Sequence, residues 1–322
     1  MTVLSVFIVT YNSAPLLRSC LDSLRAQTLT GNFEVIVVDN ASRDESVAII
    51  EAEYPEVHLI VSPVNLGFGN ANNLALTIAK GRYLVLLNPD ATLTADTLER
   101  SLIHMEETSD AGMGGGLLQG TKTEWQPSAR LFPSLLNDGL TLSGLANRYP
   151  DSRFFGRFDR SWADPLKAVA VDWVPGAFVI LRRSLVAQIS LFDPRFFLYY
   201  EEVDLCRRIH QAGFKVYYWP DLVITHVGGA SSETVDELVF ASSGKQLTLW
   251  RMQSQILYYR KWHGLIYSWL AKVLEQIWHS LRAWRNTNRA PDKAAESRHI
   301  VQLWRQAWQE THGGLISPHQ PW

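Results

Sequence analysis

Four short apolar runs alternate with helical patterns in the first hundred residues, and this order limits the fold more than any other feature. The runs cover residues 4–9, 35–38, 57–61 and 83–87 and are rich in β-branched side chains. Between the first two, apolar residues recur at helical spacing from Leu16 to Leu24. Because strand, helix and strand in succession form parallel pairs with right-handed crossovers, the order predicts an α/β fold with a mostly parallel central sheet flanked by helices.

The same patterns predict where the first helices begin and end. Ser13 precedes the first helix as a candidate N-cap, and Pro15 lies in its first turn. We expect a second helix to follow Ser42 and a third to end at Gly81.

The composition is that of an ordinary globular protein. The chain has 322 residues, of which 47% are hydrophobic and 19% are charged, so it can bury a large core. Its net charge of −2 argues against nucleic acid as the main partner. Two cysteines, Cys20 and Cys206, cannot build a disulfide framework. With no charged leader and no run of about 18 apolar residues, we expect a cytoplasmic protein.

Polar residues follow each of the four predicted strands. They are Thr10, Tyr11 and Asn12, then Asp39 and Asn40, then Asn65, and finally Asn88, Pro89 and Asp90. Each alone is an ordinary turn residue. Together they favour a pocket, because open α/β sheets bind ligands at the carboxyl ends of their strands. The usual G-x-G-x-x-G, P-loop and G-x-S-x-G signatures are absent, so the pocket serves another chemistry.

The middle of the chain carries a second polar cluster. We expect the glycine-rich stretch at 112–116 to be irregular, and the insertion that follows it to about residue 166 is weakly patterned. Residues 172–181 then indicate a loop that enters a buried strand. An aromatic run at 196–200 then precedes three acids at a helix start, Glu201, Glu202 and Asp204. The helix dipole favours such acids, so a structural role is one interpretation. The aromatic run before them favours the other interpretation, a general base, because apolar surroundings raise the pKa of a carboxylate toward working pH.

Two further strands are predicted at residues 215–219 and 222–225, and His226 follows the second. A single histidine is more often structural than a ligand. Here the two glycines after Val227, Gly228 and Gly229, permit close backbone approach, which makes the two interpretations equally open.

Eight segments in this order resemble the family 2 glycosyltransferases, which are inverting, nucleotide-sugar-dependent enzymes with the GT-A fold. They are VTYN at 9–12, VVDNASRDES at 37–46, NLGFGNANN at 65–73, LLNPD at 86–90, WVPGAFVILRR at 173–183, FFLYYEEVDLCRR at 196–208, ITHVGG at 224–229 and YYRKWHG at 258–264. The resemblance covers about residues 3–263. It is closest to the branch that transfers L-rhamnose from dTDP-L-rhamnose in O-antigen and cell-wall polysaccharide synthesis.

The resemblance implies roles for individual residues. The nucleotide-binding positions are Thr10, Tyr11, Asn12 and Asp39, with Asn65, Asn88 and Asp90 at the neighbouring strand ends. Asp90 matches the last acid of the family's D-x-D metal motif, and His226 matches a histidine that completes the metal site in some members. Glu202 matches the catalytic base, with Glu201 as the alternative. The acceptor side is implied to include Trp173, Gly176 and Asp204.

Two departures from the family pattern stand out. Asn88 replaces the first acid of D-x-D, so the cation would rest on Asp90, His226, diphosphate oxygens and water, a site suited to Mg²⁺ or Mn²⁺. The usual Glu-Asp pair is Glu201-Glu202, which leaves the identity of the base open between them. Asn88 is also the best argument for a rival interpretation, a non-catalytic scaffold that binds sugar nucleotide or glycan.

The implied reaction is transfer of a sugar from a nucleoside diphosphate to a hydroxyl of a glycan or a polyprenyl-diphosphate-linked glycan. A single base suffices for inversion by in-line displacement, unlike the acid and base pair of a glycoside hydrolase. A sugar-1-phosphate nucleotidyltransferase is a second rival. That class expects a basic, glycine-rich loop after the first strand, where this chain has Tyr11 to Ala14.

The C-terminal part differs from the rest of the chain. We expect a catalytic domain at 1–245, with a nucleotide half at about 1–110 and an acceptor half at about 166–245, and a helical extension at 246–322. From Lys245 onward there are 11 Lys and Arg against 4 Asp and Glu, and eight of the 12 tryptophans.

Residues 264–285 carry a continuous apolar helical stripe, and a polar linker at 286–297 precedes a shorter helix. Such a stripe commonly packs on its own protein. Tryptophan with arginine and lysine is also typical of helices at membrane interfaces, so residues 264–308 are a candidate for peripheral contact with the inner face of the plasma membrane.

Overall fold

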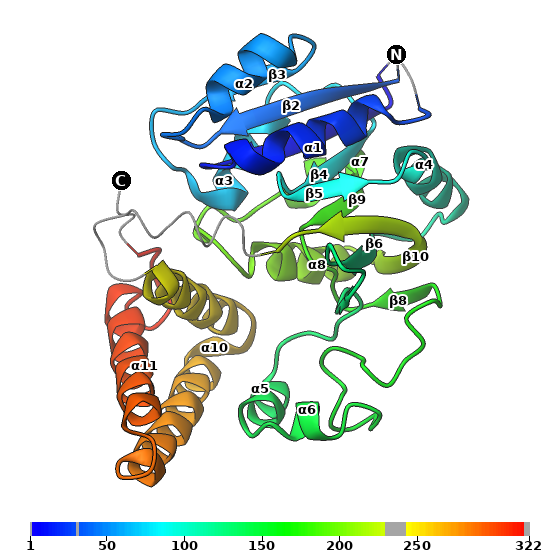
Figure 1. The fold of residues 1–322 in the computed structure, drawn as a ribbon. Coiled ribbons are helices and arrows are strands. Elements are labelled where there is room, and N and C mark those ends of the chain that lie inside the picture. The colour runs from blue at the N-terminus through cyan, green and yellow to red at the C-terminus, as the bar shows by residue number, and fades with distance from the viewer. Residues whose placement is uncertain (1, 30–31, 229–242, 319–322) are drawn as a thin grey trace.

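A ten-stranded mixed sheet organises the parts of the chain that the computed structural model describes, residues 2–29, 32–228 and 243–318 (Figure 1). Its main path runs β3-β2-β1-β4-β9-β6-β10-β5, with β7 beside β6 and β8 beside β10. The strands are β1 (Leu4–Thr10), β2 (Phe33–Asp39), β3 (His58–Val61), β4 (Tyr83–Leu87), β5 (Ala91–Leu93), β6 (Ala111–Gln119), β7 (Trp125–Gln126), β8 (Val169–Val171), β9 (Phe178–Arg182) and β10 (Lys215–His226).

The first four strands pair in parallel, as the alternating pattern predicts. Their side chains enter two cores, one on each face: Phe7 and Val9 pack on one side of β1, while Val6 and Ile8 pack on the other. Burial on both faces explains why these strands are uninterrupted apolar runs. The second half of the sheet is mixed, because β9 lies antiparallel between β4 and β6.

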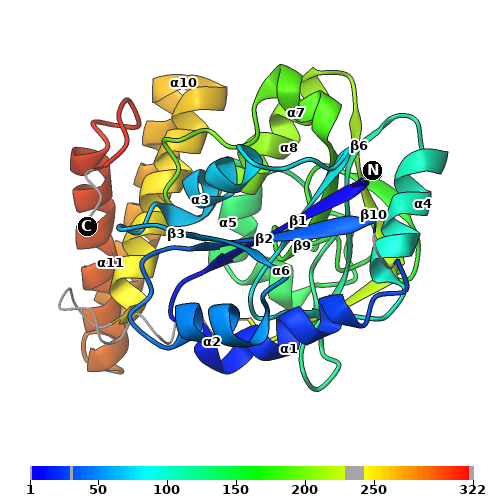
Figure 2. The ribbon, with the colours of Figure 1, turned by 90° about the horizontal axis from the view of Figure 1, so that it is seen from above.

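Helices cover both faces of the sheet, as the views in Figures 1 and 2 show. In chain order they are α1 (Ala14–Arg25), α2 (Ser46–Glu53), α3 (Gly67–Leu76), α4 (Thr97–Glu107), α5 (Leu135–Leu142), α6 (Leu145–Arg148), α7 (Arg183–Ile189), α8 (Glu201–Gln211), α10 (Ser243–Asn286) and α11 (Pro291–Glu310).

Several predicted boundaries are wrong. Ser13 makes no side-chain cap, because Asp44 accepts the Ala14 N–H at 2.9 Å instead. The second helix begins at Ser46 rather than just after Ser42, since residues 42–45 form the loop beside Asp39. The third helix ends at Leu76, before Gly81.

The glycine-rich stretch is not irregular but forms β6, and the cause is packing. A methyl group on Gly114 would collide with the ring of Trp219, and one on Gly116 would collide with the Leu222 carbonyl. Glycine here lets β10 and its tryptophan lie directly on the strand. β10 itself is one strand with an irregularity between Trp219 and Val223, where two strands were predicted.

The C-terminal helices form a hairpin that extends from the body on the side away from β1–β3 (Figure 1). α10 is interrupted at Gly264, which has φ 84° and divides it into residues 243–263 and 265–286. The first part joins the body, since Leu257, Tyr258 and Tyr259 belong to one of the sheet's two cores. The domain boundary at residue 245 remains a prediction.

The predicted linker is shorter than expected. α11 begins at Pro291, because proline at the first position of a helix needs no hydrogen-bond partner for its nitrogen.

No helix in the described ranges combines the length and apolar character needed to span a bilayer.

Candidate active site

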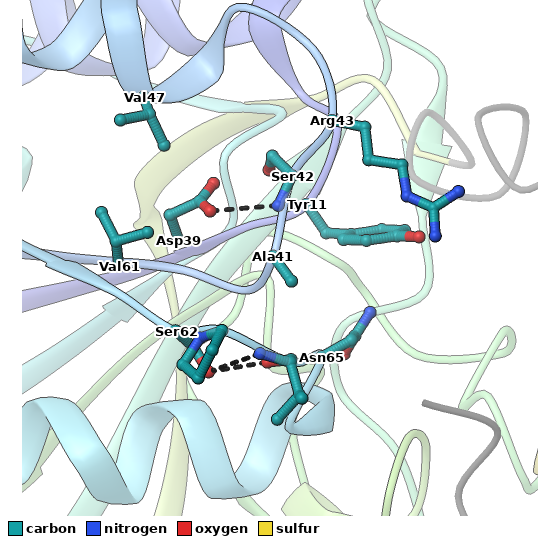
Figure 3. A pocket seen from close by; sticks show the side chains of 11 residues that line it. Tyr11, Asp39, Ala41, Ser42, Arg43, Val47, Val61, Ser62 and Asn65 are labelled. Carbon is teal, nitrogen blue, oxygen red and sulfur yellow. Dashed lines mark hydrogen bonds between the residues drawn. The ribbon is translucent and has the colours of Figure 1, made fainter.

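A hollow of about 390 Å³ lies at the carboxyl ends of β1, β2 and β3 (Figure 3). Tyr11 and Arg43 lie on one side of it, and Val47 and Val61 on the other, with Asp39 between them. Asn65 closes the hollow from the loop after β3. Its size and its position at the strand ends fit the base and ribose of a nucleotide.

Two buried oxygen atoms at this edge lack partners within the described chain. Asp39 is almost fully buried, and its Oδ2 accepts the Ser42 N–H at 3.0 Å, while Oδ1 has no hydrogen bond. The Thr10 hydroxyl is also buried without a partner. Buried polar atoms are normally paired with protein, water or a ligand, so both are candidates for contact with a polar ligand.

The loops after β1 and β2 hold each other in place. Asn12 N–H donates to Ser42 Oγ at 2.9 Å, and Asn12 Oδ1 accepts the Arg43 N–H at 2.7 Å. Ala41 has φ 66°, a conformation that costs a non-glycine residue of the order of 1 kcal/mol. The interlocked loops therefore keep the pocket wall in a strained shape. The predicted Asn12 serves this framework and does not line the hollow.

Asn65 organises the connection from the pocket to the acidic helix. Its Oδ1 accepts hydrogen bonds from Asn40 Nδ2 at 2.8 Å and from the Gly67 N–H at 2.9 Å. Phe68 N–H then donates to the Phe197 carbonyl at 3.0 Å. Gly67 has φ 77°, and a methyl group there would collide with that carbonyl, so only glycine permits the approach.

Asp90 and His226 meet at the next strand ends. The β5–β10 pairing places His226 opposite Ala91, and His226 Nε2 lies 3.4 Å from Asp90 Oδ1. Asn88 Nδ2 lies 3.5 Å from the same nitrogen. His226 retains partial exposure, so a ligand can reach it. Gly229 lies outside the described residues.

Gln126 orients the His226 ring, a role that no local pattern around residue 126 predicts. Its Oε1 lies 2.9 Å from Nδ1 of His226, and its Nε2 donates to the His226 carbonyl at 2.9 Å. An acceptor at Nδ1 places the proton there and leaves the lone pair of Nε2 facing Asp90. This donor set fits a divalent cation. In the described residues no three acidic, histidine or cysteine side chains gather as a complete metal cage, so the remaining ligands would come from diphosphate and water.

The acids at the start of α8 follow two strained residues. Tyr199 and Tyr200 have φ 70° and 67°, and strain of this kind collects at functional sites. One oxygen of Glu201 and one of Glu202 are buried with no hydrogen-bond partner. Burial, and then the neighbouring Glu202, raise the pKa of Glu201 well above its usual value. Burial also raises the pKa of Glu202, against the nearby Arg130.

Glu202 has the better access of the two acids. It is partly exposed, whereas Glu201 is buried. The Cα of Gly176 faces it, since a methyl group there would lie 3.9 Å from Glu202 Cβ and 3.7 Å from the Phe68 ring. The next residue, Ala177, accepts the Asn88 N–H at 2.9 Å. A single turn thus separates Glu202 from the loop that carries Asp90.

Two predicted acceptor residues lie in packed surroundings. Trp173 is buried and donates through Nε1 to the Leu131 carbonyl at 2.7 Å. Asp204 is fully buried, and its two oxygens are held by Lys261, Trp262 and Arg208 at 2.6–2.9 Å. The Asp204 carboxylate has no free face for an acceptor hydroxyl. It joins α8 to α10, and the predicted acceptor contact finds no support at this position.

Comparisons with known proteins identify the family of the chain. Residues 5–162 match the model of glycosyl transferase family 2. N-acetylglucosaminyl-diphospho-decaprenol L-rhamnosyltransferase of Mycobacterium tuberculosis H37Rv is 30% identical over 237 residues, which cover 70% of this chain and 76% of that protein. Rhamnosyltransferase WbbL of Escherichia coli K12 is 26% identical over 232 residues, covering 69% and 82%.

Solved structures show the same fold. GalNAc-T7 with UDP, GalNAc and Mn²⁺ aligns with a TM-score of 0.56 at 13% identity, over 95% of this chain and 55% of that one. S. aureus TarS 1-349 with UDP aligns with a TM-score of 0.51 at 18% identity, over 95% and 92%. The family model and the mycobacterial relative together show that the chain belongs to glycosyl transferase family 2.

Proposed function

We propose that this chain is an inverting rhamnosyltransferase. It moves L-rhamnose from dTDP-L-rhamnose to a hydroxyl of a polyprenyl-diphosphate-linked glycan. The names of the two relatives support the sugar, and the mycobacterial name supports the lipid-linked acceptor. Family membership disfavours the nucleotidyltransferase alternative.

The observation that carries the proposal is the pair of acids, Glu201 and Glu202, each with one buried oxygen that lacks a hydrogen-bond partner, across one turn from the Asp90 loop. Glu202 takes the proton of the acceptor hydroxyl as its oxygen bonds to the anomeric carbon. The bond from that carbon to the diphosphate oxygen breaks on the opposite side, and the nucleoside diphosphate leaves. Burial raises the pKa of Glu202 and so strengthens it as a base.

The remaining residues hold the donor. Asp39 and Tyr11 line the hollow and contact the nucleoside, and Asn65 forms part of the wall. The buried Thr10 hydroxyl at the end of β1 provides a further polar group beside them. Asp90 and His226 would hold Mg²⁺ or Mn²⁺, which would neutralise charge on the leaving diphosphate. Asn88 lies beside them and offers an amide in place of the usual acid.

A transfer assay tests the proposal. The purified full chain is supplied with a short-chain polyprenyl diphosphate that carries N-acetylglucosamine, and with dTDP-L-rhamnose, dTDP-glucose or UDP-glucose. We expect Mn²⁺- or Mg²⁺-dependent product with dTDP-L-rhamnose, of inverted anomeric configuration. Transfer only from another donor, or only binding without turnover, would contradict it, and the latter would support a scaffold.

A further inference from the structure

The second part of α10, residues 265–286, turns its apolar side to solvent. Ile266 is 74% exposed, Ile277 55% and Trp284 79%. At 3.6 residues per turn these three lie almost directly above one another. The residues on either side of this line are also exposed and apolar: Trp269, Leu270 and Leu281.

The opposite side of the same segment is buried, although it is small or polar. It carries Ser268, Ala271, His279 and Ala283, and α10 and α11 pack along their length. An amphipathic helix on a protein surface normally does the reverse. The large apolar side chains therefore make little contribution to packing within the described chain, and their exposure calls for another partner.

The charge around this face indicates which partner it is. A hollow of about 390 Å³ beside Trp284 is lined by Arg298 and Arg305, by polar side chains and by the apolar Ala283 and Val301. Residues 265–318, which include the second part of α10 and α11, have 7 Lys and Arg against 4 Asp and Glu. A second copy would bring the same positive charge to the face, whereas an anionic lipid surface complements it.

We propose that residues 265–284 lie along an anionic bilayer, with the apolar line in the boundary between headgroups and acyl chains. The Arg298 and Arg305 hollow receives a lipid phosphate. Trp269, beside the line, and Trp284, at its C-terminal end, suit this depth, because an indole has an apolar body and a polar N–H. The inference deepens the proposed function, whose lipid-linked acceptor lies in such a membrane.

Vesicle flotation of the full chain tests this surface. The triple variant Ile266→Ser, Ile277→Ser, Trp284→Ser is expected to lower the partition coefficient by about tenfold or more, because it removes most of the insertable apolar area. Its matched control is Ile78→Ser, Ile103→Ser, which changes two exposed apolar residues elsewhere on the body and should float like the wild type.

The charge contribution is tested with Arg298→Gln, Arg305→Gln. This variant should lose several-fold in binding to vesicles with phosphatidylglycerol and little in binding to phosphatidylcholine alone. Equal flotation of the triple variant and wild type would overturn the proposal. So would a wild-type dimer that the triple variant converts to monomer while neither form binds vesicles.

Transfer to a water-soluble acceptor separates this proposal from the proposed function. The triple variant should retain wild-type kcat with such an acceptor. A wild type that floats but transfers no sugar would support docking and contradict the function. A wild type that transfers sugar but binds no vesicle would overturn docking alone.

Discussion

The catalytic body and the second part of α10 use apolar side chains in opposite ways. In β1, Ile8 and Val9 point to opposite faces of the sheet and both are buried by helices. In residues 265–286, Ile266 and Ile277 lie on one helix face, and that face is the one exposed to solvent. The comparison teaches that periodicity identifies which residues share a face, but not whether that face meets protein or something else.

The largest expected effect is a loss of sugar transfer in the catalytic body, with no change in the C-terminal hairpin. Glu202→Gln should lower kcat by about 10²–10⁴-fold, because the acceptor proton loses its base. Donor affinity and vesicle binding should stay near the wild-type values. Glu201→Gln is the matched control and should lose less. A near-normal kcat for Glu202→Gln, with a large loss in the control, would move the base to Glu201.

Gln126→Leu tests the cation site through a residue that does not touch the cation. Without the Gln126 acceptor, no hydrogen bond at Nδ1 fixes the tautomer of the His226 ring. The Mn²⁺ concentration needed for half-maximal activity should rise by about 10–100-fold. Gln126→Glu, which keeps an acceptor, should restore most of the affinity. An unchanged Mn²⁺ requirement in Gln126→Leu would show that the His226 ring is not a ligand.

Two glycines with positive φ sharpen the contrast between the regions. Gly67→Ala in the body should lose about 3 kcal/mol of unfolding free energy, because the new methyl group collides with Phe197 in addition to the cost of a positive φ. Gly264→Ala in α10 meets no atom within 4 Å, so only its backbone angles of φ 84° and ψ 178° oppose the change, and it should lose about 1–2 kcal/mol. Denaturant titration of both variants measures the difference. Equal losses would mean that the Phe197 contact does not constrain the body.

The smallest effect concerns the contact between the body and α10. Asp138 on α5 accepts hydrogen bonds from Tyr259 at 2.6 Å and Gln255 at 3.2 Å, and burial raises its pKa to about 6. The folded protein therefore favours the protonated acid, and stability falls as pH rises through about 6.

Asp138→Asn should remove this dependence. We expect a gain of about 1–2 kcal/mol at pH 8 and none at pH 4, measured by unfolding at both values. A loss at pH 8 would show that the ionised carboxylate is needed to hold α10.

Local patterns predicted the nucleotide half well. Parallel strands buried on both faces are continuous apolar runs, so β1 and β4 are plain in the sequence. The strand-end rule then located Asp39, Asp90 and His226 without any side-chain contact. β6 was missed because its glycines make sense only beneath Trp219, about a hundred residues later.

The missing parts of the site share one cause. Gln126 and Arg130 lie in an insertion without periodicity. They matter through the hydrogen bonds of Gln126 to His226 and the electrostatic effect of Arg130 on Glu202. The family resemblance implies an acceptor role for Asp204, and the sequence gives no local sign of its ion pairs because their partners include a residue distant in the chain. Lys261, which neutralises it, lies in α10, and no local pattern joins the two.

Anomalous scattering from Mn²⁺ in crystals grown with dTDP would show directly whether one cation and one nucleotide occupy this site. We expect one ion between Asp90 and His226 Nε2, with the nucleoside in the hollow lined by Tyr11 and Asp39. An ion bound elsewhere, or a nucleotide that leaves Asp39 Oδ1 and Thr10 Oγ1 without partners, would contradict it.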